Sequence, residues 1–441
     1  MDDTLAAVHT KEFQPMTDVL RGLPGLAVLL MIAFALSMNR RAIQPRVVLS
    51  ALATQVAIGA LVLFVPWGRI ALGGAATAVG HVIAYGNKGI EFLFGGLVSP
   101  RMFELFGDGG FVFAFRVLTA IIYVSALIAV LYHLGVMRWV VLGLGLLFQK
   151  LLGVSKIESF SAVTTIFLGQ SEMPAVLKPF TAQLRGPELF AVMSSGMAAI
   201  AGSLLAGYAG LGVKLDYLIA ASFMAIPGGL LFAKIICPST EPSAVRFDEI
   251  HFDEQPATNA IEAAASGAAV GMRVAVNVGA MLIAFIGLIA LLNGMVGGIM
   301  GWFGYPQLNI ETLLGYAFAP IGWLIGVPWE HAGIAGNLIG QKLILNEFVA
   351  YVSFSPYLKD AATVAAAGLT VLEPKTLVIM SFALCGFANF SSIAILAGGF
   401  AAVAPELRPQ VARFGLRVVA AATLSNLASA TIAGMFLGSG G

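Results

Sequence analysis

Long apolar runs separated by short polar stretches make up most of the chain. A helix that crosses a bilayer needs about 20 predominantly apolar residues. The runs that approach or exceed this length, counting a short first one, are Leu23–Met38, Val47–Trp67, Val117–Leu134, Leu189–Val213, Tyr217–Cys237, Val274–Met300, Thr376–Val403 and Val418–Leu437. The pattern predicts an all-α polytopic membrane protein with about eight transmembrane helices.

Three further stretches are less uniformly apolar. Arg69–Leu97 is rich in glycine and carries ionisable side chains, which is typical of an amphipathic helix lying at the membrane interface. Ile157–Arg185 and Glu311–Tyr351 are apolar but are interrupted by Pro, Gly and acidic residues. Each is long enough for a re-entrant hairpin, since non-helical backbone is tolerated at membrane depth where it is buried in protein or lines a cavity.

Basic residues near the ends of the runs predict the orientation in the membrane. They form three clusters: Arg40, Arg41 and Arg46; Arg138, Lys150 and Lys156; and Arg408, Arg413 and Arg417. All three lie on one side if both termini are outside. This topology places the clearly soluble segment Pro238–Glu262 in the cytoplasm, as a solvated loop with charged residues Glu241, Arg246, Asp248, Glu249, His251, Asp253 and Glu254.

Composition narrows the class of protein. Only 11% of the residues are charged and 59% are hydrophobic, whereas soluble domains carry about 25% charged residues. The net charge of +1 and the lack of a basic block give no sign of nucleic-acid binding. Cys237 and Cys385 provide neither a disulfide framework nor metal-ligand spacing, and residues 1–21 lack the pattern of a removable signal peptide.

A weak internal repeat favours a transporter. Ser195–Ala198 resembles Cys385–Ala388, and each follows one of the predicted hairpins in a span rich in small residues. Interrupted segments paired in two inverted halves indicate a transporter's binding site. We therefore divide the chain into N-terminal scaffold helices with the interfacial helix (1–156), a first hairpin with transport helices (157–237), a cytoplasmic loop with a long scaffold helix (238–310), and a second hairpin with transport helices (311–441).

Two acidic residues lie deep in apolar segments, where a carboxylate is costly and is a functional candidate by default. Glu172 follows Gln170 and Ser171, and Glu347 follows Asn346. A helix break also leaves backbone N–H and C=O groups unpaired. Together these groups suit a neutral polyhydroxylated or heterocyclic ligand. The alternative is that both carboxylates lie at the interface and are solvated.

A third polar cluster follows in the repeat. Asn389 and Ser392 are three residues apart and would share one face of a helix, and Phe387 could pack against a planar ring. The alternative role is hydrogen bonding between transmembrane helices.

Three motifs, Gly169–Glu172, Leu345–Tyr351 and Cys385–Ser392, resemble the signatures of the concentrative nucleoside transporter family, with further similarity at Gly315–Pro320, Gly326–Trp329 and Gly340–Lys342. The resemblance implies a homotrimer in the bacterial inner membrane, with a scaffold and a mobile transport domain that works as an elevator without a cofactor. It further implies that the nucleobase meets Gln170, Ser171 and Glu172, that the ribose meets Glu347, Asn389 and Ser392, and that Phe387 lines the pocket.

One departure from the family concerns the coupling ion. The resemblance implies a sodium region around Thr165, Leu168, Ala199 and Ile200, in which sodium-coupled relatives carry Asn and Ser where this chain has Thr165 and Ala199. The loss of side-chain oxygens favours protons, with sodium as the alternative. A proton needs only a carboxylate that titrates near the working pH, and the sequence does not choose between Glu172 and Glu347.

Other functions are less well supported by the residues. A transporter of another small polar solute would share the hairpin architecture. An intramembrane enzyme would need a catalytic motif, such as His-Glu-x-x-His or Gly-x-Ser-x-Gly, and the sequence has neither. A channel is a third alternative, and its flux would not depend on a coupling ion.

Overall fold

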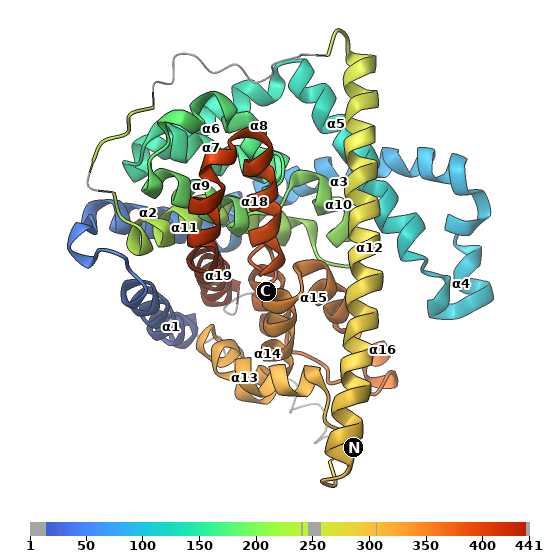
Figure 1. The fold of residues 1–441 in the computed structure, drawn as a ribbon. Coiled ribbons are helices and arrows are strands. Elements are labelled where there is room, and N and C mark those ends of the chain that lie inside the picture. Colours follow the sequence, from blue (N-terminus) through green and yellow to red (C-terminus); the bar gives the residue numbers. More distant parts are fainter. Residues whose placement is uncertain (1–14, 240, 246–256, 306, 438–441) are drawn as a thin grey trace.

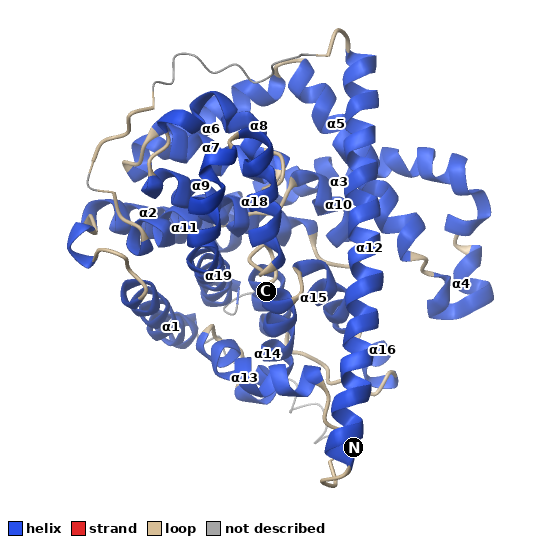
Figure 2. Cartoon of the chain, viewed as in Figure 1, coloured by secondary structure: helices blue, strands red, loops and turns tan. Residues whose placement is uncertain are grey.

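The computed structural model describes residues 15–239, 241–245, 257–305 and 307–437. Every regular element in these ranges is a helix (Figure 2), so the predicted all-α class is confirmed. In this part of the chain six helices are long and apolar enough to cross a membrane: Pro45–Phe64, Ala114–His133, Gly186–Gly210, Leu215–Ile236, Ala260–Gly301 and Pro405–Phe436.

The remaining predicted spans are shorter or divided. The first is α1 (Pro15–Ala35) and the seventh consists of α17 (Pro374–Ala383) and α18 (Ser391–Val403). The predicted span Leu189–Val213 corresponds to Gly186–Gly210, one of the six long segments, and it is interrupted between α9 (Gly186–Ala198) and α10 (Gly202–Gly210). The total of eight therefore stays a prediction, whereas the two interruptions agree with the internal repeat. The repeat segments differ by about one turn, since Ser195–Ala198 ends α9 and Cys385–Ala388 lies in the break after α17.

The segment predicted as the first hairpin folds as α7 (Lys156–Leu168), α8 (Met173–Leu177) and a 3₁₀ helix (Lys178–Gln183). A capping box between Ser155 and Glu158 fixes the start of α7. The helix ends at Gly169, whose φ of +84° is accessible to glycine without strain. Glu172 is therefore held at a backbone break, as predicted.

The segment predicted as the second hairpin contains three helices rather than two: α13 (Ile310–Leu324), α14 (Trp329–Ile344) and α15 (Glu347–Phe354). A 115° bend separates α13 from α14, and a second break at residues 345–346 separates α14 from α15. Asn346 caps α15, because its Oδ1 accepts from the amide of Val349 at 2.9 Å. Glu347 consequently lies in the first turn of a new helix.

Two groups of closely packed helices stand out. One group is a body in which α11 (Leu215–Ile236) contacts α9, α19 (Arg408–Leu437) and α2 (Pro45–Gly59), and α1 and α17 also pack on α19. The other is the pair formed by α5 (Thr119–His133) and α12 (Ala260–Gly301). In Figure 1, α12 runs through the full height of the molecule, in yellow, beside the body.

Close contact between α5 and α12 depends on glycine. A Cβ atom on Gly271 would lie 2.7 Å from Cα of Ile122, and one on Gly267 would lie 2.7 Å from the carbonyl oxygen of Ser125. The long helix also begins earlier than the predicted boundary at Val274, because Asn259 caps an alanine-rich segment that continues into the apolar run.

Several elements surround these groups: α3 (Pro66–Phe94), α4 (Arg101–Phe106), α6 (Val136–Leu152), which packs on α7, and α16 (Ala361–Ala366). The predicted interfacial segment is one long helix, α3, with few buried residues, and its depth in the membrane stays a prediction. Of the predicted cytoplasmic loop, Glu241 pairs with Arg185 at 2.6 Å. The loop residues Arg246, Asp248, Glu249, His251, Asp253 and Glu254 lie outside the described residues.

Candidate functional site

Four helix breaks within the described ranges meet in the body. The amide of Phe387, after α17, donates to the carbonyl of Ala199, after α9, at 3.3 Å. The amide of Phe390 donates at 3.1 Å to the carbonyl of Leu343, near the end of α14. Gly169, after α7, brings its backbone against Ala201, since a Cβ atom there would lie 2.8 Å from that side chain. All three predicted motifs therefore meet at one place.

Glu347 is the most completely hydrogen-bonded carboxylate of this centre. The Tyr208 hydroxyl donates to its Oε1 at 3.0 Å, and the Asn389 amide donates to its Oε2 at 3.1 Å. Only 4% of Glu347 is exposed, and its place in the first turn of α15 adds the favourable field of a helix N-terminus. The two hydrogen bonds and the helix N-terminus stabilise an ionised carboxylate, whereas burial opposes ionisation.

Asn389 and Ser392 are adjacent, but not because they share a helix face as predicted. Asn389 precedes α18, and its Oδ1 accepts from the Ser392 amide at 2.9 Å and from the Ser391 hydroxyl at 2.7 Å. Asn389 thus caps α18 while its amide group reaches Glu347. The Gln170 amide donates to the Ser392 hydroxyl at 2.7 Å, which connects the first hairpin to the same cluster.

The base-side candidates differ strongly in environment. Gln170 is buried, and its Oε1 has no hydrogen-bond partner in the described part of the chain. Ser171 is exposed, and Glu172 is half-buried with no hydrogen-bond partner among the described residues. The buried hydroxyl of Tyr132 on α5 is also unpartnered there, and it interacts electrostatically with Glu172. The base side therefore holds unused hydrogen-bonding capacity.

The candidate ion region lies between α7 and the α9 break, and three of its oxygens take part in hydrogen bonds within the protein. The Thr165 hydroxyl donates to the carbonyl of Ala162 at 2.9 Å, and the Thr165 carbonyl accepts from Gly169 at 3.0 Å. The Ala199 carbonyl is the acceptor for Phe387 described above. Ile200 is buried and Leu168 is half-buried, and neither offers a side-chain oxygen.

Sequence reasoning missed three polar residues of this centre: Tyr208, Lys342 and Asn426. Tyr208 and Asn426 are polar positions within apolar runs, and Lys342 lies in a motif to which no role was given. Lys342 is 4% exposed and Asn426 is 2% exposed. The available signal in the sequence was a lysine within a largely apolar segment, where a charged side chain is costly.

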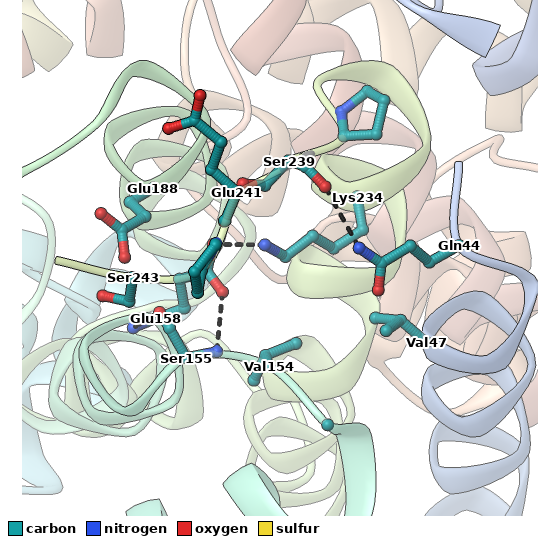
Figure 3. Close-up of a pocket in the computed structure, with 13 residues that line it drawn as sticks. Gln44, Val47, Val154, Ser155, Glu158, Glu188, Lys234, Ser239, Glu241 and Ser243 are labelled. Carbon is teal, nitrogen blue, oxygen red and sulfur yellow. Dashed lines mark hydrogen bonds and ion pairs between the residues drawn. The ribbon is translucent and has the colours of Figure 1, made fainter. Parts of the chain in front are cut away.

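A separate cavity of about 400 Å³ lies between α2, α7, α9, α11 and residues 238–239 and 241–243 (Figure 3). Lys234 is paired with Glu158 at its wall, and Glu188 accepts from the Arg185 amide at 3.1 Å. None of the predicted site residues lines this cavity, so it is distinct from the centre where the breaks meet.

Nearly the whole chain is similar to known nucleoside transporters. Families described as Na+ dependent nucleoside transporter N-terminus and C-terminus match residues 24–97 and 217–434, and one described as nucleoside recognition matches residues 114–214. The Escherichia coli (strain K12) protein NupX is 53% identical over 96% of this chain and 99% of its own length. Nucleoside permease NupC of Helicobacter pylori is 47% identical over 94% and 97%.

Solved structures give the same result. The chain matches the transporter CNTnw in an inward-facing substrate-bound state, with a TM-score of 0.90 and 54% identity over 96% of this chain and 98% of that one. It also matches a CNTnw variant in an outward-facing state, with a TM-score of 0.92 and 53% identity over 96% and 99%. The relatives are transporters and permeases rather than enzymes.

Proposed function

Because the chain belongs to the concentrative nucleoside transporter family, and is therefore a multi-pass membrane protein, we propose that it imports nucleosides by proton symport. The observation that carries the proposal is the connected cluster of Glu347, Asn389, Ser392 and Gln170 at the meeting point of four helix breaks. Both facing states known for CNTnw support alternating access.

The cluster offers two kinds of contact to a nucleoside. On the ribose side, Glu347 accepts from hydroxyl groups while Asn389 and Ser392 donate or accept, and a carboxylate acceptor makes the stronger, charge-assisted bonds. On the base side, the free Oε1 of Gln170 and the carboxylate of Glu172 face a heterocycle together with Ser171. Phe387 lines the pocket. Polar groups left unpaired by a poor substrate make such a site selective.

We assign the coupling proton to Glu172 rather than Glu347. Tyr208, Asn389 and the α15 N-terminus all stabilise the ionised form of Glu347. Glu172 has no such donor in the described residues, so taking up a proton there breaks no hydrogen bond.

Sodium symport is the second candidate, because the matching families are described as Na+ dependent. The Thr165 hydroxyl and nearby carbonyls still provide oxygen ligands of the type that hard cations prefer. Protons remain the better proposal, since Thr165, Leu168, Ala199 and Ile200 provide a single side-chain oxygen, the Thr165 hydroxyl.

The elevator mechanism requires a division into a mobile body and a scaffold. We retain residues 157–237 and 311–441 in the transport domain and residues 238–310 in the scaffold. The packing of α1 and α2 on α11 and α19 favours moving both from the predicted N-terminal scaffold to the transport body. We further propose a homotrimer in the bacterial inner membrane with both termini outside.

Uptake of radiolabelled uridine into proteoliposomes tests the proposal. The proton and sodium gradients are imposed separately, and choline replaces sodium in the proton arm. We expect accumulation driven by an inward proton gradient alone. Uptake that stops without sodium at fixed pH contradicts proton symport, and a preference for amino acids or sugars over nucleosides contradicts the substrate class.

A further inference from the structure

A buried polar relay joins two helices that end at the site. The Lys342 ammonium donates to the carbonyl of Ala383 and to Oδ1 of Asn426, both at 2.7 Å. The nitrogen of the same Asn426 amide group, Nδ2, donates to the carbonyl of Ala198 at 2.7 Å. Lysine and asparagine thus connect Ala383 to Ala198 through three hydrogen bonds.

The two carbonyls at the ends of this relay have equivalent positions. Ala198 is the last residue of α9 and Ala383 is the last residue of α17, and each half-helix ends at one of the two breaks. The last carbonyls of a helix lack intrahelical partners and carry partial negative charge. One ammonium and one amide satisfy both ends at once.

The breaks are packed tightly onto the relay. A Cβ atom on Gly386 would lie 2.5 Å from both the Ala198 carbonyl oxygen and Oδ1 of Asn426. Gly386 precedes Phe387 and comes shortly before Asn389, the side chain that donates to Glu347. A shift of the relay is therefore transmitted through one short segment to two proposed substrate contacts.

Charge gives the relay a second role. Lys342 interacts electrostatically with Glu347, and both side chains are 4% exposed. Lys342 and Glu347 form no direct ion pair, because the Lys342 ammonium is bound to Ala383 and Asn426, so the two side chains interact only through space.

We propose that Lys342 and Asn426 are positioning residues for nucleoside binding, acting as a clamp that holds the ends of α9 and α17 at one separation. The inference rests on the proposed function. The clamp touches the substrate through none of its own atoms, and it acts through Phe387, Asn389 and Glu347. A tie that merely stabilises the fold would change the melting temperature and leave nucleoside affinity unchanged.

Two substitutions test the two residues of the clamp one at a time. Asn426→Asp keeps an acceptor for Lys342 and the size of the side chain, but it replaces the donor to Ala198 with an acceptor. Lys342→Met removes the ammonium and keeps most of the length. Lys234→Met is the matched control, since Lys234 is also a largely buried lysine, paired with Glu158 at the separate cavity.

Uridine dissociation constants of the purified full-length protein, measured by calorimetry alongside melting temperatures, test the clamp. We expect each clamp substitution to weaken uridine binding about tenfold, equivalent to about 1.4 kcal/mol. Because both substitutions act through one relay, the double variant should lose no more uridine affinity than the more affected of the two single variants. Lys234→Met lowers the melting temperature and retains wild-type affinity.

Folded variants that keep wild-type affinity while losing thermal stability would overturn the clamp. If Lys342→Met does not fold, Asn426→Asp decides by the same criterion. A wild-type protein that binds no nucleoside overturns the proposed function and the clamp together, whereas wild-type binding with unaffected variants overturns the clamp alone.

Discussion

Among the six candidate membrane spans in the described part of the chain, the three most hydrophobic are also the three least buried. The apolar stretches of α5 and α12 have mean hydropathies of 2.2 and 2.5, yet only 22% and 11% of their residues are buried. The body helices α11 and α19 have mean hydropathies of 1.8 and 1.5, and 83% and 89% of the same stretches are buried. This order is the reverse of a soluble protein, because lipid accepts apolar surface as readily as a protein core does.

The comparison indicates where polar chemistry belongs in such a fold. Polar side chains are costly in lipid and are retained where protein groups satisfy them. In the body, Gln55 donates to Ser429 at 3.0 Å, and Asn426 and Lys342 satisfy the ends of two helices. Buried polar side chains in the body, rather than the most apolar segments, therefore indicate where the site lies.

The largest expected effect comes from removing charge inside the body. Glu347→Gln keeps the shape of the side chain but replaces one acceptor oxygen by a donor that opposes Tyr208 or Asn389. We expect uridine binding to weaken by about 1.5–3 kcal/mol, the value of a hydrogen bond to a charged group. Equilibrium binding to the purified protein measures it.

A matched experiment uses deoxyribonucleosides. They should lose less affinity in Glu347→Gln than ribonucleosides do, because they present one hydroxyl fewer to the carboxylate. Unchanged uridine affinity in this variant would show that Glu347 is not on the ribose side.

The next largest effect concerns the packing of α5 against α12. Gly271→Leu places a side chain against the backbone of α5, since even its Cβ would lie 2.7 Å from Cα of Ile122. We expect a loss of stability of about 1–3 kcal/mol from overpacking. Uridine affinity should stay at the wild-type value because the site lies in the body. Thermal melting and binding measured on one preparation separate the two.

Gly294→Leu is the control on the same helix, because a Cβ atom there meets nothing within 4 Å. It should leave both quantities unchanged. A fall in uridine affinity in Gly271→Leu, with Gly294→Leu normal, would mean that α5 and α12 also shape the site.

A third prediction concerns the break that faces α5. Glu172→Gln removes the proposed proton acceptor but keeps a side chain that can hydrogen-bond a base, so uptake should lose its dependence on the proton gradient while uridine binding persists. Titration of one carboxylate changes the rate of uptake at most about tenfold per pH unit. The loss of pH dependence in this variant therefore corresponds to about 1.4 kcal/mol per pH unit. The pH dependence of uptake in proteoliposomes measures it. Retention of proton-driven accumulation in this variant excludes Glu172 as the acceptor.

The sequence predicted the helical class and the interruptions of the two hairpin segments, because local composition determines these features. The breaks after α9 and α17 were not predicted from composition, since Leu189–Val213 and Thr376–Val403 are continuous apolar runs. The sequence also placed Glu172 and Glu347 at breaks. The cap formed by Asn389 was not predictable from the spacing of Asn389 and Ser392, since the helix begins after Asn389. Lys342 could not be assigned a role because its partners, Ala383 and Asn426, are distant in sequence and meet only after packing.

The smallest expected effect compares two neighbouring residues at the first break. Gln170 is buried, donates to Ser392 and has a free Oε1, whereas Ser171 is exposed. Gln170→Ala should change the ratio of uridine to adenosine affinity by about threefold to tenfold, or about 0.7–1.4 kcal/mol, because an amide presents a donor and an acceptor to a base edge. Ser171→Ala should change it by less than about 0.5 kcal/mol, as is usual for exposed positions. Competition of each nucleoside against radiolabelled uridine measures the ratio. If Gln170→Ala weakens all nucleosides by one factor, Gln170 supports Ser392 without selecting the base, and selectivity then falls to Glu172.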